Sequence, residues 1–599
     1  MNEKRNDIKR LYGENVLRLA SAIRAGKTRN RLFVAGELVA FCTAMAAFVA
    51  WASGGLRAPL LCSGIAMLLA YAVVRRLDTR NMRATEHLEA LRAYYIKEVE
   101  AMEGNFSSFD DGSRFSDTSH PFTCDLDMFG RGSLFQRVCR CVTPGGKQRL
   151  ARYLSVLPKD KETVMNRRQA IAEMAGMEQW RAEWNCNASA EIPPVCLPDG
   201  NPMPVAVPRR FSSAPCLVFV FLSIAGLYAS ILLSVFGGLP SSVPTLWAVV
   251  QLGVAIGITA RPLRSISGSG ERLLRALDRY VPLVRLVCDV RFRSGRLVSL
   301  QRDLRGGGDA LAAFGELRGI LDGYDRRGNI LGMVVFNILF MSDFFLVRRY
   351  CKWHSRHAGR VGKWIDTIAE TDALVSMSTF AYDHPEACSP AVTDDGGVCF
   401  EARGLWHPFL GDDAVPNDFT IAHCNYYIIT GANMAGKSTF LRAIGVNYVL
   451  AMAGMPVFAS EMKVSMFNLF TSMRTTDDLQ HGISYFNAEL IRLRLLLDSV
   501  RENPPCTLII LDEILKGTNS LDKLNGSRMF LEAVSKLPVS GVIATHDLEL
   551  SRMAEGSGRF HNHCFEIKLG EGVTYSYKIT PGVAKNQNAT YLLKRILNE

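Results

Sequence analysis

The chain has 15 cysteines but lacks any repeated spacing among them. The nearest pair, Cys139 and Cys141, is separated by a single residue, which is not the spacing of a zinc site. We therefore expect free thiols, as in proteins of a reducing cytosol.

A cleavable signal peptide is missing as well. Residues 1–30 form a long, basic and amphipathic stretch before the first apolar run, which is not the pattern of a signal sequence. We expect a cytoplasmic helix here. The 599-residue chain has a net charge of +11 and a pI of about 9.0, which favours nucleic acid or an anionic membrane surface as a partner without deciding between them.

Charged side chains are scarce in four apolar runs, at 32–52, 59–74, 216–236 and 246–260, and Glu37 is the only one inside them. A short turn joins the runs in pairs. We therefore predict two transmembrane helical hairpins, at 31–76 and 211–262, surrounded by membrane lipid. The run at 59–74 is short, so the alternative is a deeply buried helical hairpin of a soluble protein.

Basic residues flank both hairpins on their outer sides, for example at 75–76 and 209–210. By the positive-inside rule, this distribution places the N-terminus, segment 77–210 and everything after 261 in the cytoplasm. We therefore predict a multi-pass protein of the cell inner membrane. Segments 77–210 and 263–390 have helical periodicity and are expected to form an all-α core and lever.

Residues 330–347 are apolar enough to suggest a fifth span. Asn337, Ser342 and Asp343 interrupt this run, and a fifth span would place the C-terminal region outside the cell. We therefore predict that residues 330–347 form a buried helix of the lever.

Beyond Val398, short β-branched runs alternate with helical runs, which predicts an α/β nucleotide-binding domain over 391–599. The predicted strands are 419–422, 426–430, 466–473, 507–511, 539–545, 563–569 and 573–579. The sequence T-G-A-N-M-A-G-K-S-T contains the phosphate-loop pattern G-x-x-x-x-G-K-S. A strand enters this loop and a helix leaves it, which directs backbone N–H groups at a polyphosphate. The residues expected to bind ATP are Thr430, Gly431, Ala432, Asn433, Met434, Ala435, Gly436, Lys437, Ser438 and Thr439.

Further side chains complete the predicted site. Lys437 is expected to reach the β- and γ-phosphates, while Ser438 and Asp512 are expected to hold Mg²⁺. Asp512 and Glu513 end an apolar strand, and Glu513 is placed there to polarise the attacking water. His546 ends another apolar strand and is expected to read the γ-phosphate, the alternative being a structural histidine.

Ser484 precedes a helical run at 485–500. A serine hydroxyl and a helix N-terminus can together form an anion site. This site cannot be the one that contains Lys437 unless a partner molecule supplies it. The alternative is an N-cap of the following helix.

These sequences together resemble the MutS family of ATPases. The phosphate loop is similar to that family's version, in which Asn and Met fill the middle. G-L-W-H-P-F-L at 404–410 and V-P-N-D at 415–418 resemble the segments that flank its adenine pocket. L-D-E-I-L-K-G-T-N-S at 511–520 resembles its acidic box, and A-T-H-D-L-E-L at 544–550 resembles its histidine strand.

Three more segments resemble the family. D-D-L-Q-H-G-I-S-Y-F at 477–486 is similar to the composite-site signature, whose serine acts across a dimer. T-P-G-G-K-Q-R-L-A-R-Y-L at 143–154 and T-I-A-E-T-D-A-L at 367–374 resemble parts of the core and lever more weakly. The resemblance implies an α/β P-loop ATPase domain of the ABC type, a homodimer with two shared ATP sites completed by Ser484, and levers that embrace DNA.

The chain also departs from the family pattern. The family's mismatch reader is an N-terminal domain with a Phe-x-Glu wedge, whereas here we expect the N-terminus to enter a membrane hairpin directly. Phe314-Gly315-Glu316 fits the tripeptide but lies within predicted lever helices. We therefore expect a membrane-anchored, Mg²⁺-dependent ATPase that clamps DNA, by family likeness mismatched or branched DNA. The alternatives are a membrane ATPase acting on a protein or envelope partner without DNA, and a transporter, which the scarcity of charge in the spans disfavours.

Overall fold

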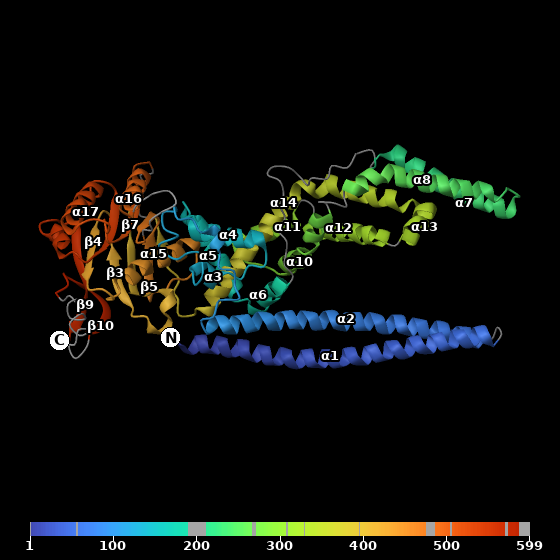
Figure 1. Ribbon diagram of the computed structural model, residues 1–599, viewed down its shortest axis with the longest axis horizontal. Coiled ribbons are helices and arrows are strands. Elements are labelled where there is room, and N and C mark those ends of the chain that lie inside the picture. Colours follow the sequence, from blue (N-terminus) through green and yellow to red (C-terminus); the bar gives the residue numbers. More distant parts are fainter. Residues whose placement is uncertain are drawn as a thin grey trace. The chain divides into compact units, whose positions relative to one another are not determined.

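The computed structural model describes residues 2–54, 58–189, 211, 213–265, 271–306, 309–328, 330–394, 396–474, 485–502, 506–569 and 573–585 (Figure 1). The chain divides into two compact units. The first contains Met1–Arg140, Leu150–Cys186 and Leu374–Glu599, and the second contains Cys141–Arg149 and Asn187–Ala373.

The first unit begins with two long helices that lie side by side, α1 (Asn2–Ser53) and α2 (Ala58–Met102) (Figure 1). Helix α1 runs without a break through the basic segment and the first apolar run. The end of the pair near the N-terminus is packed like a protein core, because Tyr12, Tyr94 and Tyr95 are buried there. The end near the connecting turn exposes apolar side chains such as Leu38.

The one acidic residue of the first apolar run is paired inside this hairpin. Glu37 is 9% exposed, and its carboxylate lies 3.3 Å from the Arg75 guanidinium on α2. The pairing partner is one of the arginines that end the second apolar run. This geometry explains how a carboxylate is accommodated next to apolar helix surface.

Segment 121–133 was predicted to be helical, and this prediction is wrong. It forms turns in which Asp127, Gly130 and Gly132 have φ angles of 52°, 104° and 77°. Contacts with residues 471–474 hold the segment in place, because Asp125 accepts hydrogen bonds from Thr471 Oγ1 (2.7 Å) and the Arg474 amide (2.8 Å).

Short helices follow these turns, as predicted from the periodicity of this region. They are α3 (Leu134–Val138), α4 (Pro144–Ser155), α5 (Lys161–Ala175) and α6 (Glu178–Asn185). Pro144 is the first residue of α4. A proline fits the first helical position because its missing N–H has no partner there.

The described residues of the second unit form helices and their connections, without a strand. It contains α7 (Ala214–Phe236), α8 (Ser242–Ser265), α9 (Glu271–Asp278), α10 (Val281–Asp289), α11 (Gly295–Arg305), α12 (Ala310–Asp325), α13 (Ile330–Phe340) and most of α14 (Ser342–Asp383). Phe314 on α12 is buried against Trp364 of α14, with 5.6 Å between ring centroids. It is therefore a core residue rather than an exposed wedge.

Two weakly family-like segments meet within this unit. The carboxylate of Asp372 accepts hydrogen bonds from the amides of Val142 and Thr143 and from Thr143 Oγ1, at 2.7–3.1 Å. Gly146 lies directly against the same carboxylate, since a Cβ there would be 2.1 Å from Asp372 Oδ2. The start of α4 is thereby locked onto α14.

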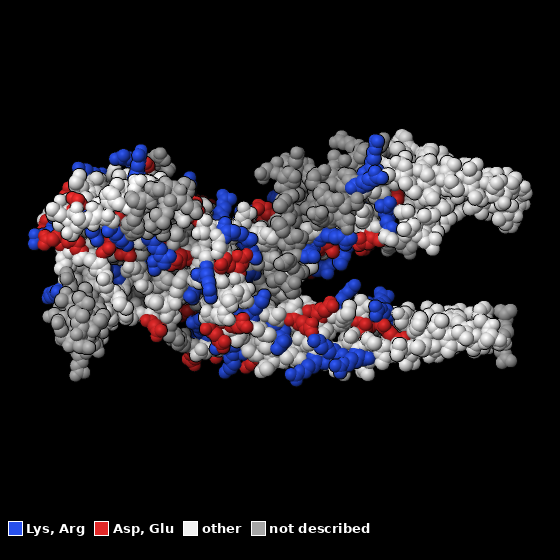
Figure 2. All heavy atoms as spheres, in the orientation of Figure 1, with Lys and Arg blue, Asp and Glu red and all other residues white. Residues whose placement is uncertain are grey.

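Four helices among the described residues are long and apolar enough to cross a membrane, namely α1, α2, α7 and α8. No more than 17% of each apolar window is buried. Figure 2 shows that the apolar end of each hairpin presents no charged side chains on the visible face. Their placement in a membrane stays a prediction.

Residues 330–347 do not form the single buried helix that was predicted. The chain bends by 84° between α13 and α14, at Met341, whose φ is 47°. Asn337 is the only buried residue of α13. Five of its apolar side chains are exposed instead, those of Ile330, Leu331, Val335, Phe336 and Phe340.

The C-terminal region contains two mixed sheets. The larger has the strand order β10-β9-β4-β8-β7-β6, in which only the β10–β9 pair is antiparallel. Its strands, all predicted, are β4 (Tyr426–Gly431), β6 (Asn468–Ser472), β7 (Thr507–Asp512), β8 (Val539–Thr545), β9 (Phe560–Leu569) and β10 (Val573–Pro581). The predicted helices are present as α15 (Lys437–Ala453) and α16 (Tyr485–Glu502), and α17 (Ser520–Val534) follows β7.

The smaller sheet has the order β1-β5-β2-β3. Its strands are β1 (Ala391–Thr393), β2 (Phe400–Leu405), β3 (Asn417–Ile421) and β5 (Glu461–Ser465). Only β3 was expected from the sequence. A helical N-terminal part followed by a C-terminal α/β region is the fold class that was predicted.

Candidate nucleotide-binding site

The predicted site residues lie at one edge of the larger sheet. Strands β4, β8 and β7 are adjacent and parallel, and their register places Thr430 opposite Thr545 and Asp512 opposite Ala544. The phosphate loop, the acidic pair and His546 therefore all leave the sheet at its carboxyl edge. Open parallel sheets bind their ligands at this edge.

The phosphate loop joins β4 to α15 through residues that adopt left-handed backbone conformations. Gly431, Met434 and Gly436 have φ angles of 155°, 66° and 104°. Gly436 is the N-cap of α15 and no side chain caps the helix. The first N–H groups of α15 are thus directed at the loop, as an anion site requires.

Lys437 is the charged group of the loop. It is 5% exposed, and its Nζ donates hydrogen bonds to the carbonyl oxygens of Gly431 (2.8 Å) and Ala432 (2.9 Å). Burial lowers the pKa of Lys437 to about 8, although the carboxylates of Asp512 and Glu513 oppose this effect. A polyphosphate partner stabilises the charged form of a buried ammonium group more than that of an exposed one.

Ser438 and Asp512 lie close enough to each other to bind one metal ion together. The Ser438 hydroxyl donates a hydrogen bond of 2.5 Å to Asp512 Oδ2. A hydroxyl and a carboxylate are the oxygen ligands that Mg²⁺ accepts beside substrate phosphates. The donor set therefore fits the predicted metal.

Glu513 follows Asp512 in a left-handed conformation, with a φ of 58°. Its carboxylate lies 3.7 Å from His546 Nε2 and 3.5 Å from Lys523 Nζ. His546 Nε2 in turn lies 3.4 Å from Lys437 Nζ. Burial and the nearby Lys437 lower the pKa of His546, which favours a neutral imidazole. Lys523, on α17, was not predicted as a member of the site.

A cavity of about 480 Å³ opens beside the loop. Trp406, His407 and Asn417 line it, so segments 404–410 and 415–418, which resemble those flanking the MutS adenine pocket, lie beside the loop. Two further lining residues, Phe565 on β9 and Tyr577 on β10, were not predicted. The volume is within the range of small-molecule sites, and aromatic walls suit a planar base.

Several loop residues have structural roles. Thr430 Oγ1 accepts a hydrogen bond from the Ala584 amide (2.9 Å), and Ala435 is buried. Met434 is 76% exposed at the tip of the loop. Asn433 and Thr439 line the cavity with the other loop residues.

The C-terminal region matches known proteins. Residues 427–594 match the family model of MutS domain V. The C-terminal region is therefore similar to MutS domain V. A DNA mismatch repair protein MutS from Persephonella marina is 29% identical over 244 residues, which are 39% of this chain and 27% of that protein. DNA mismatch repair protein MSH6 from Arabidopsis thaliana is 31% identical over 259 residues, 40% of this chain and 19% of that protein.

Endonuclease MutS2 from Carboxydothermus hydrogenoformans is 29% identical over 231 residues, 38% of this chain and 29% of that protein. The chain thus spans less than a third of each of these MutS-family relatives. The hairpins lie outside the residues matched by the domain V model.

Ser484, the residue that the MutS resemblance places across a dimer, lies outside the described residues. Helix α16 begins directly after it, as predicted. Glu489 on α16 is 4% exposed and accepts hydrogen bonds from the amides of Lys516 (3.1 Å) and Gly517 (3.3 Å). The helix that follows the composite-site signature is therefore tied to the acidic box.

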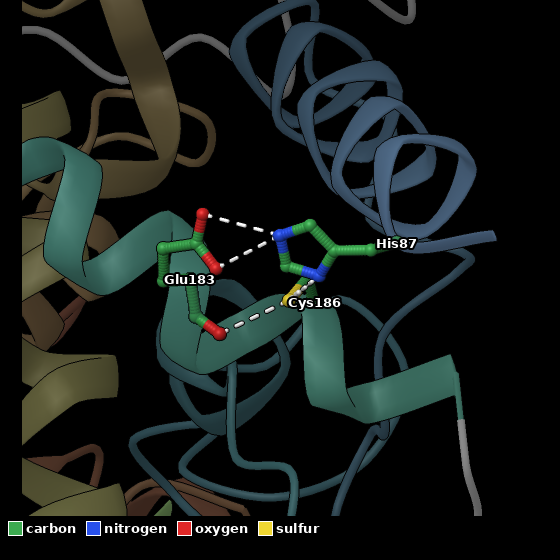
Figure 3. A group of neighbouring side chains, drawn as sticks. All are labelled: His87, Glu183 and Cys186. Carbon is green, nitrogen blue, oxygen red and sulfur yellow. Dashed lines mark hydrogen bonds and ion pairs between the residues drawn. The ribbon is translucent and has the colours of Figure 1, made fainter. Parts of the chain in front are cut away.

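A second group of potential metal ligands lies away from this site. His87 on α2, Glu183 on α6 and Cys186 have ligand atoms within 4.8 Å of one another (Figure 3). His87 Nε2 faces the Glu183 carboxylate at 3.1 Å, whereas Nδ1 faces the Cys186 thiol at 3.9 Å. The two ring nitrogens of His87 therefore face different partners, the Glu183 carboxylate and the Cys186 thiol.

Proposed function

We propose that the chain is a membrane-anchored, MutS-like ATPase that dimerises on ATP and acts on DNA. The observation that carries this proposal is the convergence of Lys437, Ser438, Asp512, Glu513 and His546 at the carboxyl edge of three adjacent parallel strands. The MutS-like match of the same region supports it independently.

The chain's own residues divide the work of ATP hydrolysis. The α15 N-terminus and Lys437 would bind the phosphates, and Ser438 with Asp512 would hold Mg²⁺, which would supply charge neutralisation on the transferring phosphoryl group. Glu513 accepts a hydrogen bond from the attacking water and orients it. His546, neutral and beside both Lys437 and Glu513, is placed to respond to the γ-phosphate.

The adenine base would occupy the cavity between Trp406, Phe565 and Tyr577. His407 lines the same wall, and burial together with Arg442 and Arg137 lowers its pKa to about 4. A neutral imidazole accepts a hydrogen bond from the Phe409 amide through Nδ1. This wall therefore adds no charge to the site, which suits an uncharged base.

Membrane anchoring by α1–α2 and α7–α8 is supported by their length, mean hydropathy of 1.7–2.5 and largely unburied apolar surface. A hairpin whose apolar side chains face water would lose roughly 25 cal/mol for each square ångström left exposed. We propose the cell inner membrane as the location, with the α/β region in the cytoplasm, where ATP is available.

A homodimer with shared sites is proposed from the MutS likeness, with Ser484 completing the partner's site. DNA would lie against the lever, where Arg285, Arg291 and Arg302 are exposed. Other arginines of this stretch are already paired, since Arg275 lies 2.7 Å from Asp325 and Arg296 binds Glu370. Phosphate contacts would therefore fall to the exposed set.

Hydrolysis is tested with Glu513→Gln. The variant should lose about 10²- to 10⁴-fold in kcat, because the group that orients the water is removed. It should also accumulate as a dimer with ATP, measured by light scattering in detergent. Glu549→Gln, at an exposed ion pair with Arg552, is the matched control. A monomeric Glu513→Gln protein under saturating ATP would contradict the shared-site model.

DNA binding is tested with the detergent-solubilised chain on duplex and branched DNA between about 50 and about 200 mM salt, the range over which phosphate contacts lose most of their affinity. Binding should weaken steeply with salt, and replacing Arg285, Arg291 and Arg302 by Gln should flatten that dependence. No binding at the lowest salt would overturn the DNA part and favour a protein or envelope partner.

A further inference from the structure

Helix α13 is an apolar helix without a protein cover on its outer face. Ile330 and Leu331 are 74% and 75% exposed, and Val335, Phe336 and Phe340 are also exposed. Figure 1 shows it as a short helix beside α8, turned across the direction of α14. An exposed apolar surface of this kind marks a contact with a partner or a membrane.

The C-terminal end of α13 is hydrogen-bonded by a residue of the second hairpin, α7–α8. Gln251 Nε2 donates a hydrogen bond of 2.7 Å to the Ile338 carbonyl, and Ser223 Oγ donates one of 2.9 Å to Gln251 Oε1. Gln251 is 1% exposed. Both residues stand near the middle of their helices, α8 and α7, so α13 ends about halfway along the hairpin.

Hydrogen bonds of the Asn337 side chain and backbone stabilise the bend between α13 and α14. Asn337 is fully buried, its Oδ1 accepts from the Asp343 amide (3.0 Å), and its Nδ2 donates to the Met333 carbonyl (3.0 Å). The Met341 amide donates to the Asn337 carbonyl (3.1 Å). Non-helical backbone at membrane depth is tolerated when protein groups satisfy it in this way.

The first turns of α14 then return along α7. Phe345 lies against Phe221, with 5.9 Å between ring centroids. Arg348 Nη1 donates to the carbonyls of Phe211 (2.7 Å) and Ser213 (3.2 Å), at the start of α7. An arginine at the cytoplasmic end of a span is the expected interface anchor.

We propose that α13 and the first turns of α14 form a re-entrant membrane segment, whose exposed apolar side chains contact lipid acyl chains. This inference rests on the proposed anchoring by α7–α8. The occupant is lipid because α13 contacts α7 and α8, which also expose apolar side chains, and because Gln251 on α8 is hydrogen-bonded to α13. Both ends of the segment carry arginine, Arg327 before α13 and Arg348 after the bend.

The ion pair of Arg327 with Asp343 fits this placement. Arg327 Nε lies 2.8 Å from Asp343 Oδ1, and the Asp343 side chain is 2% exposed. Charges near a membrane are tolerated when they pair with each other. The pair also links the start of α13 to the start of α14, which holds the re-entrant shape closed.

The test uses the full chain in vesicles of phosphatidylethanolamine and phosphatidylglycerol, with p-benzoylphenylalanine replacing one residue at a time. Phe336 reports on α13, Leu222 on the α7 span, and Met529 on α17 is the exposed control at 70%. After irradiation, mass spectrometry identifies the cross-linked species. Phe336 and Leu222 should both form phospholipid adducts, at least tenfold above Met529.

The outcomes separate the inference from the anchoring on which it rests. Lipid adducts at Leu222 without adducts at Phe336 would overturn the re-entrant segment and leave the anchoring intact. A polypeptide adduct at Phe336 would replace lipid by a protein partner. Absence of lipid adducts at Leu222 would overturn the anchoring itself, and labelling of Met529 equal to that of Phe336 would also reject the proposal.

Discussion

Tyr12 Oη donates a hydrogen bond of 2.9 Å to Asp383 Oδ1, across 371 residues of sequence. Tyr12 lies on α1, whose far end is an apolar candidate span, and Asp383 is the last residue of α14, which leads into the α/β region. Both side chains are buried. Movement of the α14 end relative to the first hairpin would therefore break a buried hydrogen bond.

The surroundings of this bond are charged. Glu98 on α2 is fully buried and forms a two-pronged pair with Arg140, with Arg140 Nε 2.9 Å from its Oε1. Arg181 is buried nearby and stacks on the ring of Tyr382. Burial and the Glu98 carboxylate raise the pKa of Asp383 to about 7.

Asp383 makes folding pH-dependent. The pKa of Asp383 is higher in the folded chain than its unfolded value of about 3.9. Its stabilising contribution to the free energy of unfolding is therefore fully present below about pH 3.9 and is lost as the pH rises towards about 7. Asp383→Asn removes this titration and keeps an acceptor for Tyr12. We expect the thermal midpoint of the wild type to fall between pH 5 and pH 8 relative to that of the variant. Asp498→Asn, at an exposed pair with Arg494, should keep the wild-type pH dependence, and an unchanged pH dependence in Asp383→Asn would refute the assignment.

The parts of the site that are formed by consecutive residues could be predicted from the sequence. Ten consecutive residues make the phosphate loop, and the buried strands β4, β7 and β8 appear as continuous apolar runs because both of their faces are covered. Strand β5 was missed because Glu461 and Lys463 alternate with buried residues over only five positions. Its identity as a strand depends on pairing with β1 and β2, which no local pattern records.

Other misses have the same origin in contacts between distant residues. Periodicity did not reveal the bend at Met341, because the groups that close it are the side chain of Asn337 and the amide of Asp343. Lys523 and Tyr577 join the site from α17 and β10, far along the chain from the loop. Their sequence neighbourhoods contain no phosphate or base signal of their own.

Binding of ATP should take up a proton at alkaline pH. Lys437 has a pKa lowered to about 8 by burial, so above that pH much of it is neutral before a polyphosphate arrives. The phosphates favour the ammonium form, and the apparent affinity should fall by up to about tenfold per pH unit above 8. Calorimetry at pH 9 in two buffers of different ionisation enthalpy measures the uptake. Lys523→Met should retain the uptake, whereas its absence in the wild type would rule out Lys437 as the titrating group.

Gly146 is a packing requirement of the joint between α4 and α14. A Cβ at this position would lie 2.1 Å from Asp372 Oδ2, the oxygen that accepts from Thr143. Gly146→Ala should therefore destabilise the fold by about 1–3 kcal/mol, through overpacking of a buried contact. Gly295→Ala is the matched control, since no heavy atom lies within 4 Å of its Cβ. Equal thermal midpoints for the two variants would show that the contact between α4 and α14 accommodates an added methyl group.

Cys186 should resist alkylation in the folded chain. Burial and the Glu183 carboxylate raise the pKa of its thiol to about 12, so at pH 8 only about one thiol in ten thousand is the reactive thiolate. Iodoacetamide followed by peptide mass spectrometry should leave Cys186 unmodified under conditions that label Cys424, which is half-buried. Unfolding in guanidinium chloride should make the two labelling rates similar. Rapid labelling of native Cys186 would contradict this account and point to a thiolate stabilised by His87, as a metal-binding arrangement of His87, Glu183 and Cys186 would require.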